Sequence, residues 1–189
     1  LYFDQDGKQV KGKIVTLADK SIRYFDANSG EMAVGKFAEG SKNEWYYFDQ
    51  AGKAVTGLQK IGQQTLYFDQ DGKQVKGKVV TLADKSIRYF DANSGEMAAN
   101  KFVEGTKNEW YYFDQSGKAV TGLQQIGQQT LYFDQNGKQV KGKIVYVNGA
   151  NRYFDPNSGE MARNKWIQLE DGSWMYFDRN GRGRRFGWN

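Results

Sequence analysis

The chain has 189 residues, of which 39% are hydrophobic and 15% aromatic, and its formal net charge is +5. It contains neither cysteine nor histidine, which excludes disulfides, thiolate or imidazole metal ligands and histidine-dependent catalysis. The mean hydropathy is −0.80, and no apolar run reaches the length of about 18 residues that a membrane span needs. We therefore expect no membrane insertion, no metal site and no cofactor, and the groups left for chemistry are carboxylates, lysines and tyrosines.

One short motif recurs from the first residue to the last. The triplet Tyr-Phe-Asp occurs nine times, starting at Tyr2, Tyr24, Tyr47, Tyr67, Tyr89, Tyr112, Tyr132, Tyr153 and Tyr176. A glycine follows each triplet closely, as Gly72 follows Asp69. Aromatic residues favour strands, and glycine takes the positive φ of a tight turn. Each repeat is therefore predicted to be a β-hairpin, with the triplet in one strand and a second short strand after the turn, such as residues 73–76.

The triplets are spaced by 20 to 23 residues, in an order that repeats after about 65 residues. Residues 1–65, 66–130 and 131–189 thus form three super-repeats of three hairpins each. Periods of this size are typical of solenoids, in which each unit buries its apolar face only by stacking on its neighbours. We predict an all-β solenoid of about nine stacked hairpins, a single repeat array over residues 1–189. Because the chain starts inside a repeat, we expect it to be a fragment of a longer protein.

The recurring aspartates raise the question of catalysis, since paired carboxylates hydrolyse glycosidic bonds. A catalytic pair needs two carboxylates in different environments of one cleft. Nine equivalent copies instead favour a turn role, in which each side chain accepts backbone N–H groups. The sequence therefore indicates a protein module without enzymatic activity.

The positive charge suggests an acidic partner, but 22 acidic residues are mixed with 27 basic ones. No nucleic-acid recognition motif is present, so we expect a mixed solvated surface and no nucleic-acid binding.

Adjacent residues of a strand point to opposite faces. Placing Leu66 and Phe68 inward sends Tyr67 outward, and the same register sends Trp45 and Tyr47 outward. The outward tyrosines then either form an exposed stacking surface or pack against the next hairpin. In another unit this register turns Arg88 inward, which argues against it.

A Gln-Val-Lys-Gly segment occurs once in each super-repeat. Its Gln and Lys share a face of the strand, next to the triplet tyrosine. An aromatic ring covers the C–H face of a sugar, while amide and ammonium groups bind its hydroxyls. With the tyrosine of the following hairpin as a second wall, this pattern predicts three sugar sites: Tyr2, Gln9, Lys11 and Tyr24; Tyr67, Gln74, Lys76 and Tyr89; Tyr132, Gln139, Lys141 and Tyr153.

Two segments, residues 45–57 (WYYFDQAGKAVTG) and 62–69 (GQQTLYFD), carry a resemblance to a known family. The chain resembles, over nearly its whole length, the C-terminal glucan-binding repeats of streptococcal and Leuconostoc glucosyltransferases, or glucansucrases, within a superfamily of choline-binding and cell-wall-binding repeats. The resemblance implies a hairpin solenoid, a secreted or wall-associated location in a Gram-positive bacterium, and non-catalytic binding of α-glucan such as dextran or mutan and of isomalto-oligosaccharides. It also implies a catalytic domain elsewhere in the same polypeptide, and pockets that combine an aromatic ring with Gln and Lys.

Two other functions stay open: anchoring to teichoic acid or another wall polymer, and a purely structural spacer. Choline binding is disfavoured, because repeats that cage choline commonly open with a Gly-Trp pair. Leu58 and Leu123 follow the corresponding glycines here, and Gly187–Trp188 is the one Gly-Trp pair in the sequence.

Overall fold

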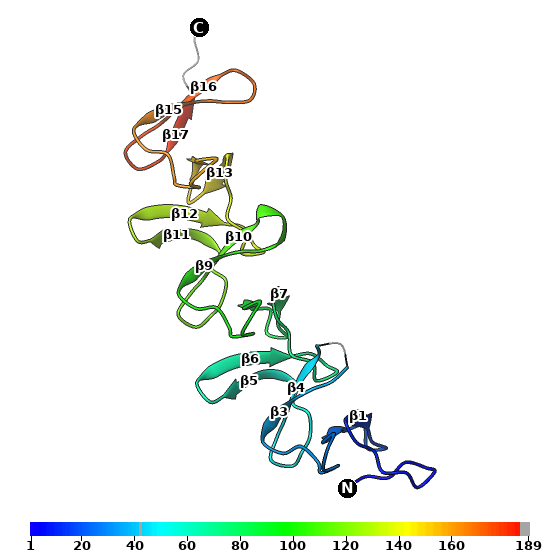
Figure 1. The fold of residues 1–189 in the computed structure, drawn as a ribbon. Coiled ribbons are helices and arrows are strands. Elements are labelled where there is room, and N and C mark those ends of the chain that lie inside the picture. The colour runs from blue at the N-terminus through cyan, green and yellow to red at the C-terminus, as the bar shows by residue number, and fades with distance from the viewer. Residues whose placement is uncertain (42, 186–189) are drawn as a thin grey trace. The chain divides into compact units, whose positions relative to one another are not determined.

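A computed structural model describes residues 1–41 and 43–185 (Figure 1). Within these ranges the chain is all-β, with seventeen strands, one 3-10 turn at η1 (Thr106–Asn108) and no α-helix. This confirms the predicted fold class. The described part contains no helix of the length and apolar character that crossing a membrane requires. The Gly187–Trp188 pair lies outside the described residues.

The strands are short and follow one another in pairs. The strands of the first half are β1 (Lys13–Thr16), β2 (Ile22–Phe25), β3 (Lys36–Glu39), β4 (Trp45–Phe48), β5 (Gly57–Ile61), β6 (Gln64–Phe68), β7 (Lys78–Thr81) and β8 (Ile87–Phe90). Those of the second half are β9 (Lys101–Glu104), β10 (Trp110–Phe113), β11 (Gly122–Ile126), β12 (Gln129–Phe133), β13 (Lys143–Val147), β14 (Ala150–Phe154), β15 (Lys165–Gln168), β16 (Trp174–Phe177) and β17 (Gly183–Arg185).

Each hairpin joins a strand to the next one in sequence, from β1–β2 to β15–β16, and β17 adds to β16 as a third strand. The triplet ends the second strand of its hairpin and pairs with the strand before it, as Tyr67 pairs with Leu58. The prediction that a second strand follows the triplet is wrong in most repeats, because that segment pairs with the triplet through a single bridge, such as Phe68 with Gln74. After the last triplet it does form a strand, β17.

Tight turns with positive φ close the hairpins. Gly62, with φ of 62°, begins the two-residue turn between β5 and β6. In the third super-repeat Asn148 and Gly149 have φ of 51° and 73° and connect β13 to β14, the combination that a type I′ hairpin turn requires. The diverged sequence at this point thus replaces a longer loop with a two-residue turn.

Triplet phenylalanines form the core. Phe68 and six of its equivalents have no exposed surface, and these are Phe48, Phe90, Phe113, Phe133, Phe154 and Phe177. Leu66 is also buried, whereas Trp45 is 37% exposed and Tyr67 is half-buried, which confirms the predicted register. Arg88 points inward as that register requires and is only 7% exposed. Its guanidinium is accommodated because it donates to the carbonyl of Ser116 and to the hydroxyl of Ser86.

The chain divides into two compact units, one formed by Leu1–Val80 with Tyr89–Ala98 and the other by Thr81–Arg88 with Ala99–Asn189. The predicted super-repeat boundaries at residues 65 and 130 do not coincide with the division between these two units, and they stay a prediction.

Candidate functional site

The triplet aspartates accept hydrogen bonds from the backbone. The Oδ1 atom of Asp69 accepts hydrogen bonds from the backbone N–H groups of Asp71 and Lys73, both at 2.9 Å. The other eight make the same kind of contact: Asp4, Asp26, Asp49, Asp91, Asp114, Asp134, Asp155 and Asp178. For Asp26, the N–H groups of Ser29 and Asn28 lower the pKa of the carboxyl, since they stabilise the charged form. The predicted turn role of these residues is confirmed.

The central predicted sugar site lies against the loop of the next hairpin. The Nζ atom of Lys76 donates to the carbonyl oxygen of Asn93 at 2.9 Å, and Nε2 of Gln74 donates to that of Ser94 at 3.3 Å. Both side chains therefore point the same way, as their spacing on the chain predicts. The amide also lies close over Gly95, where an added Cβ atom would come within 2.4 Å of it.

The tyrosine of this site packs on the next core residue. The rings of Tyr67 and Phe90 have centroids 5.4 Å apart and an interplanar angle of 22°. The exposed part of Tyr67 lines a hollow of about 330 Å³ together with Thr56, Gly57 and Gln70. Tyr89, the predicted second wall, is not among the residues that line this hollow.

The same arrangement recurs in the other two super-repeats. Lys11 and Lys141 donate to the carbonyls of Asn28 and Asn157, each at 2.9 Å. Gln139 donates to Ser158 at 3.1 Å, and Gln9 lies over Gly30 as Gln74 lies over Gly95. Tyr2 and Tyr132 stack on the next triplet phenylalanine with centroid distances of 5.2 and 5.6 Å. Tyr24 and Tyr153 likewise pack on Phe48 and Phe177.

These contacts leave part of each polar group available. An ammonium carries three donors and an amide carries two donors and an acceptor. After its contact with Asn93, Lys76 retains two N–H donors, and Gln74 retains its carbonyl oxygen. We call each such group of tyrosine, glutamine and lysine a Tyr–Gln–Lys cluster. Gln74, Lys76 and the ring of Tyr67 all contact the next hairpin, but the hollow that Tyr67 lines includes neither Gln74 nor Lys76.

The structure also reveals an aromatic surface that the sequence analysis did not assign as a site. It lies on the third hairpin of each super-repeat, where a ring in the first strand pairs across the hairpin with the triplet tyrosine. The pairs are Phe37 with Tyr47, Phe102 with Tyr112 and Trp166 with Tyr176, with centroid distances of 5.0, 4.9 and 5.3 Å. Phe37 and Phe102 are each 38% exposed and Trp166 is 49% exposed.

A signal for these aromatic pairs was present in the sequence. Residues 36–39, 101–104 and 165–168 each carry an aromatic residue at the second position, and each stretch precedes a Trp-containing strand. The two rings of each pair meet only because the triplet strand pairs with the strand before it. The predicted hairpins paired it with the segment after it.

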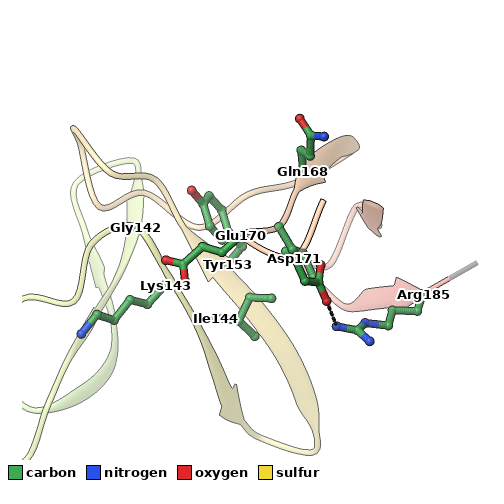
Figure 2. A pocket seen from close by; sticks show the side chains of 9 residues that line it. Gly142, Lys143, Ile144, Tyr153, Gln168, Glu170, Asp171 and Arg185 are labelled. Carbon is green, nitrogen blue, oxygen red and sulfur yellow. Dashed lines mark hydrogen bonds and ion pairs between the residues drawn. The ribbon is translucent and has the colours of Figure 1, made fainter. Parts of the chain in front are cut away.

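A larger hollow lies in the third super-repeat, between the β13–β14 hairpin and the strands β15 and β17. Its volume is about 520 Å³, and its lining includes Ile144, Tyr153, Gln168, Glu170 and Asp171. Figure 2 shows these side chains with the ion pair between Asp171 and Arg185, whose Oδ2 and Nη2 atoms are 3.3 Å apart. Of the twelve predicted site residues, Tyr153 alone lines this hollow.

Family comparisons agree with the repeat pattern. The model of the choline-binding repeat matches residues 1–37, 55–102 and 120–166. The model of the putative cell wall binding repeat matches residues 40–54, 100–119 and 164–182. The two models alternate along the chain, and each matches three times.

Relatives with the same repeats are glucosyltransferases, which confirms the resemblance noted in the sequence. The chain is 50% identical over 180 residues to glucosyltransferase-S of Streptococcus mutans, and 43% identical over 181 residues to glucosyltransferase-I of Streptococcus downei. Each match covers 95% of this chain but only 12% and 11% of the two relatives. The chain therefore corresponds to a small part of those proteins.

Solved structures of choline-binding proteins share the fold. Choline binding protein F from Streptococcus pneumoniae aligns with 97% of this chain and 60% of its own length, at 27% identity and a TM-score of 0.73. The choline-binding domain of CbpL from the same species covers 98% of this chain with 92% of its own, at 22% identity and a TM-score of 0.73. A hairpin-repeat architecture is thus common to all three.

Proposed function

The chain belongs to the choline-binding repeat family, and within it we propose that this chain is a non-catalytic module that binds α-glucan at several sites at once. The observation that carries the proposal is the threefold recurrence of the Tyr–Gln–Lys cluster, in which each lysine bonds to the loop of the next hairpin and each tyrosine packs on the next triplet phenylalanine. A polymer of one repeating sugar is the ligand that such a recurrence suits.

The chemistry of a cluster suits a neutral sugar. The exposed edge and face of Tyr67 offer apolar surface to the C–H groups of a pyranose ring. We assign the remaining donors of Lys76 and the carbonyl oxygen of Gln74 to hydroxyl groups of the same glucan. The same holds for Tyr2, Gln9 and Lys11, and for Tyr132, Gln139 and Lys141. The tyrosines of the following hairpins, Tyr24, Tyr89 and Tyr153, complete the proposed sites.

The aromatic pairs on the third hairpins add to this surface. They face away from the phenylalanine core and recur once in each super-repeat, so a glucan that lies along one unit meets both kinds of contact. Each single contact is shallow and weak. Several weak sites on one polymer raise the apparent affinity by on the order of 10²- to 10⁴-fold.

We further propose that the module is attached to a glucosyltransferase catalytic domain and acts outside the cell or at the cell wall. The streptococcal relatives and the cell-wall-binding repeats support this. In that setting the module retains the α-glucan product, dextran or mutan, near the enzyme. Isomalto-oligosaccharides are the short ligands expected to compete.

Native gels that contain dextran test this function, run at low and at high salt. We expect retardation that high salt does not reduce, because the ligand is uncharged. Replacing the glutamine in all three clusters (Gln9→Ala, Gln74→Ala and Gln139→Ala) should reduce retardation. The control is Tyr146→Ala, which removes an aromatic ring that is 73% exposed and belongs to no cluster.

The result also separates the alternatives. Absence of retardation in both dextran and an α-1,3-glucan would overturn the proposal. Binding to teichoic acid that weakens steeply with salt would instead indicate a wall anchor, because lysine contacts with phosphate are screened. A spacer would bind neither polymer.

A further inference from the structure

The third super-repeat differs from the first at the positions that pack over the preceding hairpin. In the first, an added Cβ atom on Gly40 would lie 2.9 Å from Cε2 of Tyr46 and 3.3 Å from Cγ1 of Ile14. Tyr46 is 4% exposed, and Ile14 and Tyr24 pack against its cluster. The tyrosine ring thus occupies the space between the two hairpins.

The third copy has no ring at this position. Leu169 stands where the first copy has Gly40, and Met175 stands where it has Tyr46. Met175 is buried with Ala162 and Phe177, and Leu169 packs against that cluster from outside. The space above Ile144 and Tyr153 is then the hollow of about 520 Å³ shown in Figure 2. This volume is within the range of small-molecule sites, about 300–1,000 Å³.

The lining of the hollow has an apolar side and a polar side. Ile144, Tyr153 and Leu169 supply the apolar side. Asp171 is held in place, because its Oδ1 atom accepts the N–H of Ser173 at 2.9 Å and its Oδ2 atom faces Arg185. Among the described residues, Glu170 has no hydrogen-bond or ion-pair partner. Its carboxylate is therefore available to a ligand.

The charges that line the hollow balance. Lys143 and Arg185 contribute two positive charges, and Glu170 and Asp171 contribute two negative ones. A phosphate polymer would meet two carboxylates, and a quaternary ammonium would meet two cations with a single aromatic ring. A neutral ligand with many hydroxyl groups meets an aromatic face, acceptors and donors together.

We propose that this hollow is an additional sugar subsite, specific to the third super-repeat, that takes one glucosyl unit of an α-glucan. Its wall is Tyr153, and Gln168, Glu170 and Asp171 bind the hydroxyl groups. This assignment rests on the proposed glucan-binding function; it shares Tyr153 with the third proposed site, but its lining excludes Tyr132, Gln139 and Lys141 and uses carboxylates instead. The third copy thereby acquires a site that the first copy closes with Tyr46.

The test is an NMR titration of the whole chain with isomaltotriose, following the backbone amide signals. We expect saturable shifts at residues 168–171. The double substitution Leu169→Gly with Met175→Tyr rebuilds the packing of the first copy and should abolish those shifts, while shifts at residues 67–76 persist. Glu170→Gln changes only an exposed carboxylate and should weaken binding at residues 168–171 by about 10-fold or more, the loss expected for a hydrogen bond to a charged group.

The outcomes distinguish this subsite from the general function. Shifts at residues 67–76 without shifts at residues 168–171 would overturn the subsite and leave the proposed function intact. An unchanged response in both variants would overturn it as well. Saturable shifts at residues 168–171 with choline or glycerol phosphate, and none with isomaltotriose, would show that the hollow takes a different ligand. If the double variant is unfolded by circular dichroism, the Glu170→Gln result decides alone.

Discussion

The ammonium of Lys141 lies 5.7 Å from the centroid of the Trp110 ring while it donates to the carbonyl of Asn157 at 2.9 Å. That distance is within the range of a cation–π contact, about 6 Å. The chain's own lysine therefore takes a position over the tryptophan that a ligand cation would need.

We predict from this contact that choline does not bind at Trp110. Titrating choline into the wild-type chain should give no saturable change in tryptophan fluorescence, whereas choline binding protein F serves as the positive control. In Lys141→Ala the ring loses its cation, so any choline response should appear only in that variant. A saturable response of equal size in both proteins would contradict the prediction.

Gly95 should be intolerant of a side chain for two separate reasons. Its φ is +75°, and an added Cβ atom would contact the Gln74 amide and Lys76. Gly127 provides the matched control, because its φ is +59° and nothing lies within 4 Å of an added Cβ atom. Gly127→Ala should lower the free energy of unfolding by about 1–2 kcal/mol, the cost of the left-handed conformation. Gly95→Ala should lower it by more, as measured by urea denaturation.

The comparison also probes the Tyr–Gln–Lys cluster. Gly95→Ala should weaken dextran retention because it displaces Gln74, and Gly127→Ala should leave retention unchanged. Equal losses of stability and of retention in the two variants would show that the amide does not press on Gly95.

Much of this fold follows from local chemistry that a sequence reveals. Alternation predicts that Leu66 and Phe68 are buried, and the recurrence of the aspartates predicts their turn role. The pairing partner of each triplet was not predictable in this way, because Val75 and Leu58 both flank the triplet with strand-forming residues. The strand that contains Leu58 pairs with the triplet strand over five residues, because a two-residue turn at Gly62 joins the two strands. The segment that contains Val75 follows a longer turn through Gly72 and forms only one bridge with the triplet.

In the candidate sites too, features within one segment were predictable and contacts between hairpins were not. The spacing of Gln74 and Lys76 predicts that both side chains point the same way, and both do contact the next hairpin. Their partner carbonyls at Asn93 and Ser94 belong to the next hairpin, and a contact between hairpins depends on how they stack. The hollow beside Tyr153 depends on residues from four separate strands and from the segments between them. No pattern within one repeat marks it.

Arg152 offers a test of how an arginine is accommodated in the core. Arg152 is 8% exposed, and its Nε atom has no hydrogen-bond partner among the described residues. In the second super-repeat the corresponding Nε of Arg88 donates to the hydroxyl of Ser86 at 3.2 Å. The third copy has Ala150 at the position of Ser86, which explains the missing partner.

We predict that Ala150→Ser stabilises the chain by about 0.5–1.5 kcal/mol, the net value of one hydrogen bond. The reciprocal change, Ser86→Ala, should lower the free energy of unfolding by about 1–3 kcal/mol, because it leaves a buried donor unsatisfied. Urea denaturation of both variants measures these effects. A destabilised Ala150→Ser would mean that the hydroxyl does not reach Nε of Arg152.

Below pH 8, stability should depend on pH only in the acid range. In the folded chain, backbone N–H donors lower the pKa of Asp26 and of Asp155 below their ordinary values. A carboxyl whose pKa is lower in the folded than in the unfolded state stabilises the fold at pH values above its unfolded pKa. That contribution is lost as the pH falls through the folded pKa. Without histidine, no side chain with an ordinary pKa titrates between about pH 6 and 8.

We therefore expect the urea midpoint to be constant from pH 6 to pH 8 and to fall steadily between about pH 4 and pH 2. Asp26→Asn removes one titrating group but keeps an oxygen that accepts the N–H of Ser29. This variant should be less stable than the wild type at pH 7, and the difference should shrink toward pH 2 as the wild-type carboxyl becomes protonated. A difference that stays constant over the whole range would show that the charge of Asp26 contributes nothing to the turn.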